Sequence, residues 1–309
     1  FSQAEMLLCR WSVRINSENL FEGERKMENL KMTICLIVVL FTTGTSMAGT
    51  WATLDKPEGI DTVTTGIDNE NIAGHYRDDT GWHGFVYNGA DWNTFDPHEG
   101  VPTWTQNIDG GNVVGWCQSY ENHGFLYDGT NLTTLEMPEA EHTYAYDIDG
   151  DNIVGYYTDS SEKRHGFLYD GTGWTTIDVP GAVETMVQGI DGNNIVGRYF
   201  DNAGQHHGFW YNGTGWTSLD MIGAYTTEAW DIDDGRIVGY YDDDSGSHGF
   251  LYDGTFWTPL NIPGGSNTIA YGIDGDKIVG TYMGGPSNPG NHGFVYTIPE
   301  PATFLLFGL

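Results

Sequence analysis

Six histidines recur at nearly equal spacing, each at the start of a His-Gly-Phe triplet. They are His83, His123, His165, His207, His248 and His292. Repeated imidazoles could bind a metal or transfer protons, because histidine titrates near neutral pH and ligates metals. A residue present in every repeat, however, usually serves the folding of each repeat, and a histidine at a strand start can hydrogen-bond a turn carboxylate. We therefore interpret the six histidines as structural.

A second candidate for chemistry is the segment Asp147, Asp149 and Asp151, whose alternating carboxylates resemble the start of a calcium loop. An EF-hand needs a bidentate acid at its twelfth position, and Thr158 stands there. A β-hairpin turn explains the segment as well. We predict no cofactor, with calcium at this segment as the alternative. The aspartates of a repeated Ile-Asp pair are expected to accept N–H bonds from their own turns. These are Asp68, Asp109, Asp149, Asp191, Asp233 and Asp274.

Positions at which the repeats differ are the better candidates for ligand binding. The residue after Val-Gly (Ala-Gly in the first repeat) is His75, Trp116, Tyr156, Arg198, Tyr240 and Thr281 in turn. Two places before the isoleucine of the Ile-Asp pair stand Thr65, Gln106, Tyr146, Gln188, Trp230 and Tyr271. Aromatic rings beside amides and charges suit sugars, so these positions predict a ligand surface around a ring. The alternative is that they fill gaps between repeats.

Catalysis has weaker support in the sequence. No Ser/His/Asp motif, phosphate loop or His-Glu-x-x-His motif is present. Glu99, Glu141 and Glu228 occur once each rather than in every repeat, and two of them could form a carboxylate pair. The alternative function is therefore a secreted hydrolase or lyase that acts on polysaccharide.

The repeat that positions these residues has a period of about 41 residues. The His-Gly-Phe triplets lie 40 to 44 residues apart and the Ile-Asp pairs 40 to 42. A third marker, Trp-x-x-apolar-Asp, keeps the same period. Each repeat predicts four short strands joined by Asp/Gly-rich turns, which is the size of a propeller blade. We expect an all-β domain of six four-stranded repeats over residues 49–296, a six-bladed β-propeller. An open β-solenoid is the alternative.

Charge and cysteine content restrict the partners and the compartment. The chain has a formal net charge of −31, and the charges before residue 49 cancel, so residues 49–309 carry all of it. Such a surface repels phosphate backbones, so we expect no nucleic-acid partner. Of the three cysteines, only Cys117 lies among the repeats, so the fold must stand without an internal disulfide. Cys117 replaces a tyrosine of other repeats, which favours a structural variation over a nucleophile.

Both ends carry segments typical of targeting. Residues 33–43 form a short apolar run after Lys31, and small residues precede a cleavage point after Ala48. This layout predicts a signal peptide at 27–48, with residues 1–26 as a spurious or disordered extension. Near the other end, Pro299, Glu300 and Pro301 precede an apolar run.

The Pro-Glu-Pro segment resembles the PEP-CTERM sorting signal of Gram-negative bacteria that make extracellular polymer. The resemblance implies an exosortase-type protease as partner and delivery to the cell surface. Residues 297–309 lack the full membrane helix and the basic cluster of that signal, so we interpret them as a truncated copy. Over residues 51–296, the His-Gly-Phe triplet with Ile-Asp and Val-Gly ahead of it is similar to the HAF-type extracellular repeat. That resemblance implies an extracellular location and no particular reaction.

We therefore predict an exported, non-catalytic surface or matrix protein. Its function would be binding or display, with a polysaccharide or a surface protein as partner.

Overall fold

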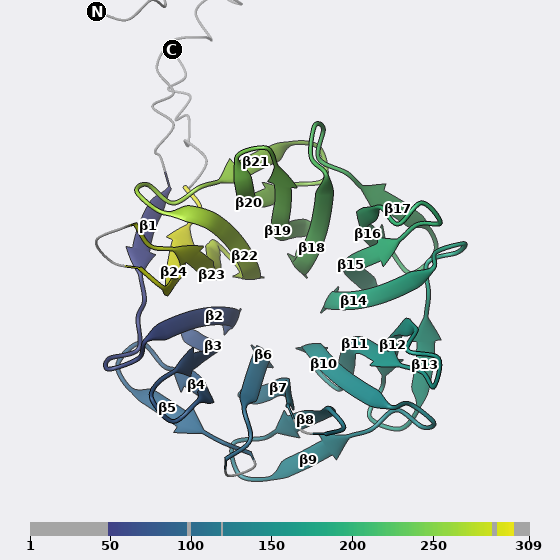
Figure 1. The fold of residues 1–309 in the computed structure, drawn as a ribbon, viewed down its shortest axis with the longest axis horizontal. Helices are drawn as coiled ribbons and strands as arrows, with labels where there is room; N and C mark the ends of the chain where they lie inside the picture. The colour runs from purple at the N-terminus through teal and green to yellow at the C-terminus, as the bar shows by residue number, and fades with distance from the viewer. Residues whose placement is uncertain (1–48, 98–99, 119, 286–288, 300–309) are drawn as a thin grey trace, which may run out of the picture. The chain divides into compact units, whose positions relative to one another are not determined.

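The computed structural model describes residues 49–97, 100–118, 120–285 and 289–299. These residues form strands and no helix, and the strands make six four-stranded antiparallel sheets around a common axis (Figure 1). The fold is a six-bladed β-propeller, which confirms the prediction and excludes the solenoid. Within the described ranges, no helix has the length and apolar character needed to cross a membrane.

Each blade runs from the axis outward through strands of four kinds. The innermost strands are β2 (Asp61–Asp68), β6 (Thr103–Asp109), β10 (His142–Asp149), β14 (Glu184–Asp191), β18 (Thr226–Asp233) and β22 (Ser266–Asp274). The second strands are β3 (Asn71–Arg77), β7 (Asn112–Cys117), β11 (Asn152–Thr158), β15 (Asn194–Phe200), β19 (Arg236–Asp243) and β23 (Lys277–Met283). Tight turns at the Ile-Asp pairs join the first kind to the second.

The outer half of each blade carries the other two sequence markers. The third strands, which begin at or near the His-Gly-Phe triplets, are β4 (Trp82–Tyr87), β8 (His123–Tyr127), β12 (Arg164–Tyr169), β16 (His206–Tyr211), β20 (Gly246–Tyr252) and β24 (Asn291–Thr297). The outermost strands are β5 (Trp92–Phe95), β9 (Leu132–Leu135), β13 (Trp174–Ile177), β17 (Trp216–Leu219), β21 (Trp257–Leu260) and β1 (Thr50–Thr53). We number the blades 1 to 6 from β2 to β22, and β1 belongs to blade 6.

The blades are offset by one strand from the sequence repeats. The Trp-x-x-apolar-Asp strand opens each sequence repeat, but in space it is the outer edge of the preceding blade. The reason is the hairpin turn after each third strand, which pairs Tyr169 with Trp174 in blade 3. As a consequence, β1 pairs with β24 and completes blade 6 with a strand from the other end of the domain.

The core consists of one apolar cluster at each of the six interfaces between neighbouring blades. Each phenylalanine of the His-Gly-Phe triplets is at most 2% exposed. The glycine of Val-Gly makes room for that ring. A Cβ on Gly197, for example, would lie 2.9 Å from Phe209. One blade alone could not cover these side chains, so the blades are stable only together.

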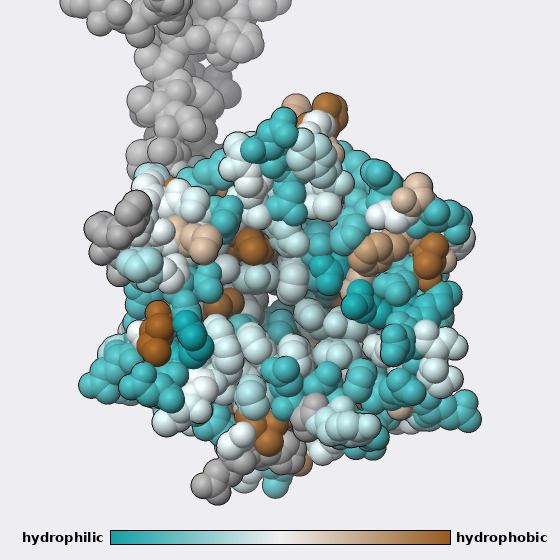
Figure 2. Space-filling model, viewed as in Figure 1, coloured by the Kyte–Doolittle hydropathy of each residue, from teal (hydrophilic) through white to brown (hydrophobic). Residues whose placement is uncertain are grey.

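The channel has two ends, which we name after the residues found there. The loop face is the end at which the innermost strands begin, and the Asp face is the end at the Ile-Asp pairs. Seen down the axis, the surface is largely hydrophilic, with separate apolar patches and a hollow centre (Figure 2).

Candidate functional site

The residues after Val-Gly lie on the second strands, directly opposite residues of the innermost strands. Trp116 pairs with Trp104, and Tyr156 pairs with Tyr144. The remaining pairs are His75 with Val63, Arg198 with Met186, Tyr240 with Glu228 and Thr281 with Ile269. Spacing from Val-Gly predicts one side of these pairs. It does not predict Trp104, Tyr144 and Met186, because these precede the repeat markers without a fixed residue type.

The second variable set has a common backbone feature. In every blade the register shifts at this position, so Thr65, Gln106, Tyr146, Gln188, Trp230 and Tyr271 each occupy a β-bulge of an innermost strand. A bulge redirects one side chain relative to its neighbours, and bulges are frequent beside functional sites.

Six rings form a continuous run, the aromatic arc, over blades 1 to 3. Its members are His75, Trp82, Trp104, Trp116, Tyr144 and Tyr156. Neighbouring ring centroids lie 4.5 to 5.4 Å apart, and the four rings from Trp104 to Tyr156 are half-buried. Burial lowers the pKa of His75 to about 4, so this ring is neutral at physiological pH.

Three further rings continue the arc across the channel. Tyr146 of blade 3 lies 5.5 Å from Tyr156 and 5.8 Å from Trp230 of blade 5, measured between centroids. Trp230 in turn contacts Tyr271 of blade 6 at 4.6 Å. Burial raises the pKa of Tyr146 to about 12, so its hydroxyl stays protonated and can donate a hydrogen bond.

The gap between blades 4 and 5 holds the charged wedge, formed by Arg198, His206, Glu228 and Tyr240. Arg198 Nη1 donates to Glu228 Oε2 at 2.5 Å, and Glu228 is only 3% exposed. Burial opposes the charge on Arg198, but the Glu228 carboxylate outweighs it and raises the arginine pKa above its usual value. Burial and the same carboxylate raise the pKa of Tyr240. His206 Nδ1 lies 3.8 Å from Glu228 Oε1.

Several buried polar atoms around these rings have no hydrogen-bond partner among the described residues. They are Trp104 Nε1, Thr105 Oγ1, Trp116 Nε1, Asn122 Oδ1, Gln188 Oε1, Arg198 Nε, His206 Nδ1 and Trp230 Nε1. A buried donor or acceptor without a partner costs about 1–3 kcal/mol, so proteins rarely gather such atoms in one place. All of them belong to blades 2, 4 and 5, beside the arc, the channel rings or the wedge.

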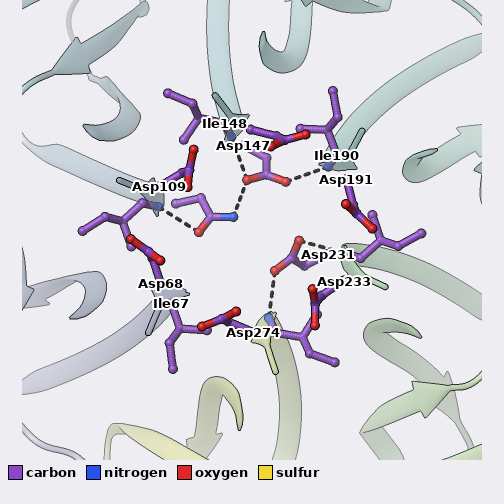
Figure 3. Close-up of a pocket in the computed structure, with 15 residues that line it drawn as sticks. Ile67, Asp68, Asp109, Asp147, Ile148, Ile190, Asp191, Asp231, Asp233 and Asp274 are labelled. Carbon is purple, nitrogen blue, oxygen red and sulfur yellow. Dashed lines mark hydrogen bonds between the residues drawn. The ribbon is translucent and has the colours of Figure 1, made fainter. Parts of the chain in front are cut away.

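The Asp face has a different construction, a ring of aspartates that come from all the blades and line a pocket (Figure 3). Hydrogen bonds between neighbouring blades join these aspartates in a closed circle. Each aspartate of an Ile-Asp pair accepts an N–H bond of 2.6 to 3.0 Å from the turn of the next blade. Asp149, for example, accepts from Gly192, and Asp274 accepts from Asn69 to close the circle. The expectation that these aspartates bond to their own turns was wrong, because converging innermost strands bring the next blade's turn within reach.

Two buried aspartates lie just inside this circle. Asp147 accepts from the backbone N–H of Ile148 and, at 2.6 Å, of Ile190 on the next blade. Asp231 makes the equivalent bonds to Ile232 and Ile273. Burial and the charge of Asp231 raise the pKa of Asp147. Burial, with lesser contributions from Asp233 and Asp191, raises the pKa of Asp231 from 3.8 to about 7.

The three aspartates of the segment considered for calcium lie in three different environments. Asp147 is buried, Asp149 belongs to the hydrogen-bonded circle, and Asp151 is exposed on the turn. Within the described part of the chain, no group of three or more His, Cys, Asp or Glu side chains has a geometry suited to a metal ion.

The triplet histidines lie at the start of the third strands, away from the channel, and each contacts the polar side chain that ends the neighbouring outermost strand. His165 Nδ1 lies 2.7 Å from Asp178, and His248 Nδ1 lies 2.8 Å from Asn261. The equivalent partners of His83, His123, His207 and His292 are Asp96, Glu136, Asp220 and Asp55. This contact joins two sequence markers, His-Gly-Phe and Trp-x-x-apolar-Asp, in one hydrogen bond.

The two described glutamates among the candidates for catalysis lie in different parts of the propeller. Glu141 is exposed on the loop face, Glu228 is paired with Arg198, and Glu99 lies outside the described residues. Cys117 is buried beside blade 1, and burial raises the pKa of its thiol to about 11, which keeps the sulfur protonated. Of the targeting segments, Ala48, Glu300 and Pro301 also lie outside the described residues, and Pro299 ends them.

Comparison with known proteins agrees on the fold alone. No protein-family model and no curated protein matches this chain. The SapL1 lectin, solved in complex with alpha methyl fucoside, aligns with a TM-score of 0.51 at 15% identity, over 79% of this chain and 98% of the lectin. The six-bladed fucose-recognising lectin of Aleuria aurantia aligns with a TM-score of 0.50 at 15% identity, over 82% of this chain and all of the lectin.

Proposed function

We propose that this chain is an exported bacterial surface or matrix protein whose propeller binds glycans and carries no catalytic role. The signal-like segment, the Pro-Glu-Pro segment and the similarity to HAF-type repeats support export, with an exosortase-type protease as the sorting partner. Exopolysaccharide is the glycan that such a location supplies.

The aromatic arc is the observation that carries the proposal. Aromatic faces pack against the apolar C–H surface of sugars, and N–H and hydroxyl groups beside them hydrogen-bond the sugar hydroxyls. The arc combines both, since Trp104 and Trp116 are half-buried and have unpartnered N–H groups. Two lectins that share the fold add support by similarity only.

A glycan array with the purified chain tests the proposal. We expect retention on a restricted set of glycans, and loss of that retention in Trp104→Ala. The matched control is Phe256→Ala, because Phe256 is an exposed aromatic residue on an outer turn, 70% accessible, outside the arc. Retention of no glycan, or equal loss in both variants, would contradict the proposal. Turnover of a bound glycan would favour the hydrolase or lyase alternative instead.

A further inference from the structure

The unpartnered polar atoms define what a ligand must supply. Indole Nε1 groups of Trp104, Trp116 and Trp230 and the Nε group of Arg198 can only donate. The Oε1 atom of Gln188 can only accept, and Gln188 is 3% exposed. It lies on the bulge of blade 4, and the neighbouring blades carry Tyr146 and Trp230 at the equivalent bulges. The unpartnered atoms around the channel therefore need both hydrogen-bond acceptors and hydrogen-bond donors from a ligand.

A hydroxyl group can accept from the N–H groups and donate to Gln188 Oε1, because it donates one hydrogen bond and accepts two. A carboxylate or sulfate would serve the indoles but not Gln188 Oε1, since an anion has no proton to donate. An ammonium group would serve Gln188 and none of the indoles. The presence of both unpartnered donors and an unpartnered acceptor therefore favours a ligand with many hydroxyl groups.

The charges of the site and of the whole chain narrow the class of ligand further. The positive charge of Arg198 is neutralised by Glu228, so the wedge offers no net charge to an anion. The chain as a whole carries −31, which repels polyanions at low ionic strength. Uronate-rich or sulfated glycans are therefore disfavoured in the same site that accepts neutral ones.

Building on the glycan-binding function proposed above, we propose that the site takes a neutral, hydroxyl-rich oligosaccharide. Its hydroxyls accept from Trp104, Trp116 and Trp230 and donate to Gln188. The aromatic arc spans three blades, which gives a sequence of sugar residues more contact than a single one.

Isothermal titration of the full chain tests this inference, with a panel of neutral oligosaccharides and their uronate-containing counterparts as probes. Trp116→Phe keeps an aromatic ring and removes the indole N–H, and we expect it to weaken binding of a neutral ligand about fivefold to tenfold. Trp174→Phe is the matched control, because Trp174 lies on an outermost strand against Phe167 and Tyr169. Melting temperatures of both variants establish that they fold.

The outcomes separate the two proposals. Tighter binding of the neutral probes, weakened by Trp116→Phe and unaffected by Trp174→Phe, supports the inference. Tighter binding of the uronate probes, or unchanged affinity in Trp116→Phe, overturns it and leaves glycan binding intact. Binding of neither class overturns both.

Discussion

Single residues in this protein divide into those that repeat and those that vary. The repeated histidine, aspartate, glycine and phenylalanine hold each blade or join it to the next. The variable residues after Val-Gly and on the bulges gather around the channel. The triplet histidine shows the first role most directly, since one hydrogen bond ties the third strand to the outermost one.

Asp178 offers a test of that role. In Asp178→Ala, His165 loses its partner at Nδ1, and we expect the free energy of unfolding to fall by about 1 kcal/mol. Asp178→Asn should cost much less, because blade 5 already places Asn261 opposite His248. Urea denaturation of both variants measures the difference. A free energy of unfolding for Asp178→Ala equal to that of the unmodified chain would show that the contact contributes nothing.

Asp231 couples stability to pH. Its folded-state pKa of about 7 exceeds the value of 3.8 expected in the unfolded chain, so the folded state holds this proton more tightly. This carboxyl therefore stabilises the fold most at low pH, and we expect its contribution to fall by about 1 kcal/mol per pH unit as pH rises from 4 to 7.

Asp231→Asn tests this effect, because an amide of similar shape does not titrate and no longer raises the pKa of Asp147 by its charge. The difference in unfolding free energy between the two proteins, measured across this pH range, should change with pH. A constant difference would mean that Asp231 is ionised throughout and that its burial is compensated in another way.

At the scale of strands, the glycine of Val-Gly is as important as the phenylalanine that covers it. In Gly197→Ala, the added methyl would contact the backbone oxygen of Met186 and the ring of Phe209. We expect a loss of about 3 kcal/mol, because neither neighbour can move without disturbing the ladder. Thermal unfolding measures it.

Gly173→Ala is the matched control for that prediction. Gly173 lies on a surface hairpin, and an added Cβ there would have only Asp170 within 4.0 Å. We expect a melting temperature close to that of the unmodified chain. Equal destabilisation by both substitutions would contradict the packing account.

Strands were the most predictable part of the molecule, and their pairing was less so. The period of Ile-Asp and His-Gly-Phe predicts four strands and a blade, because these residues mark turns and strand starts. The offset of the outermost strand was missed, since a repeated sequence has no preferred starting point. The bulge at Gln188 and its equivalents was also missed, because register depends on the partner strand.

The candidate site shows the same limit. The spacing of Trp116 and Tyr156 from Val-Gly predicted one wall of the arc. Trp104 and Tyr144 became visible only through pairing across strands. Contacts between blades, such as that of Arg198 with Glu228, join residues of different repeats, so a comparison of equivalent positions could not reveal them.

The whole ring depends on its closure by β1. Trp51 of this strand packs on Phe294 and Tyr296 of β24, at centroid distances of 5.1 and 4.5 Å. Deletion of residues 50–53 would expose the edge of β24 and uncover part of the core. We expect a melting temperature lower by more than about 10 °C. In a domain of about 250 residues 1 kcal/mol shifts the melting temperature by about 2–4 °C, so this loss corresponds to several kcal/mol.

Trp257→Ala provides the comparison for closure. It removes the equivalent ring from blade 5, where Trp257 packs on Phe250 and Tyr252, and leaves every backbone pair of the ring in place. Calorimetry should therefore show a smaller effect than deletion of β1. A deletion as mild as Trp257→Ala would mean that the ring holds without its first strand.

Glycan binding at the aromatic arc and the channel rings can be observed at the tryptophans themselves. The ¹H–¹⁵N signals of the indole N–H groups report on it directly, because each tryptophan carries one such group. On titration with a neutral oligosaccharide, we expect shifts for Trp104, Trp116 and Trp230 and none for Trp174 or Trp257. Shifts confined to the outermost strands, or no shifts at saturating sugar, would contradict it.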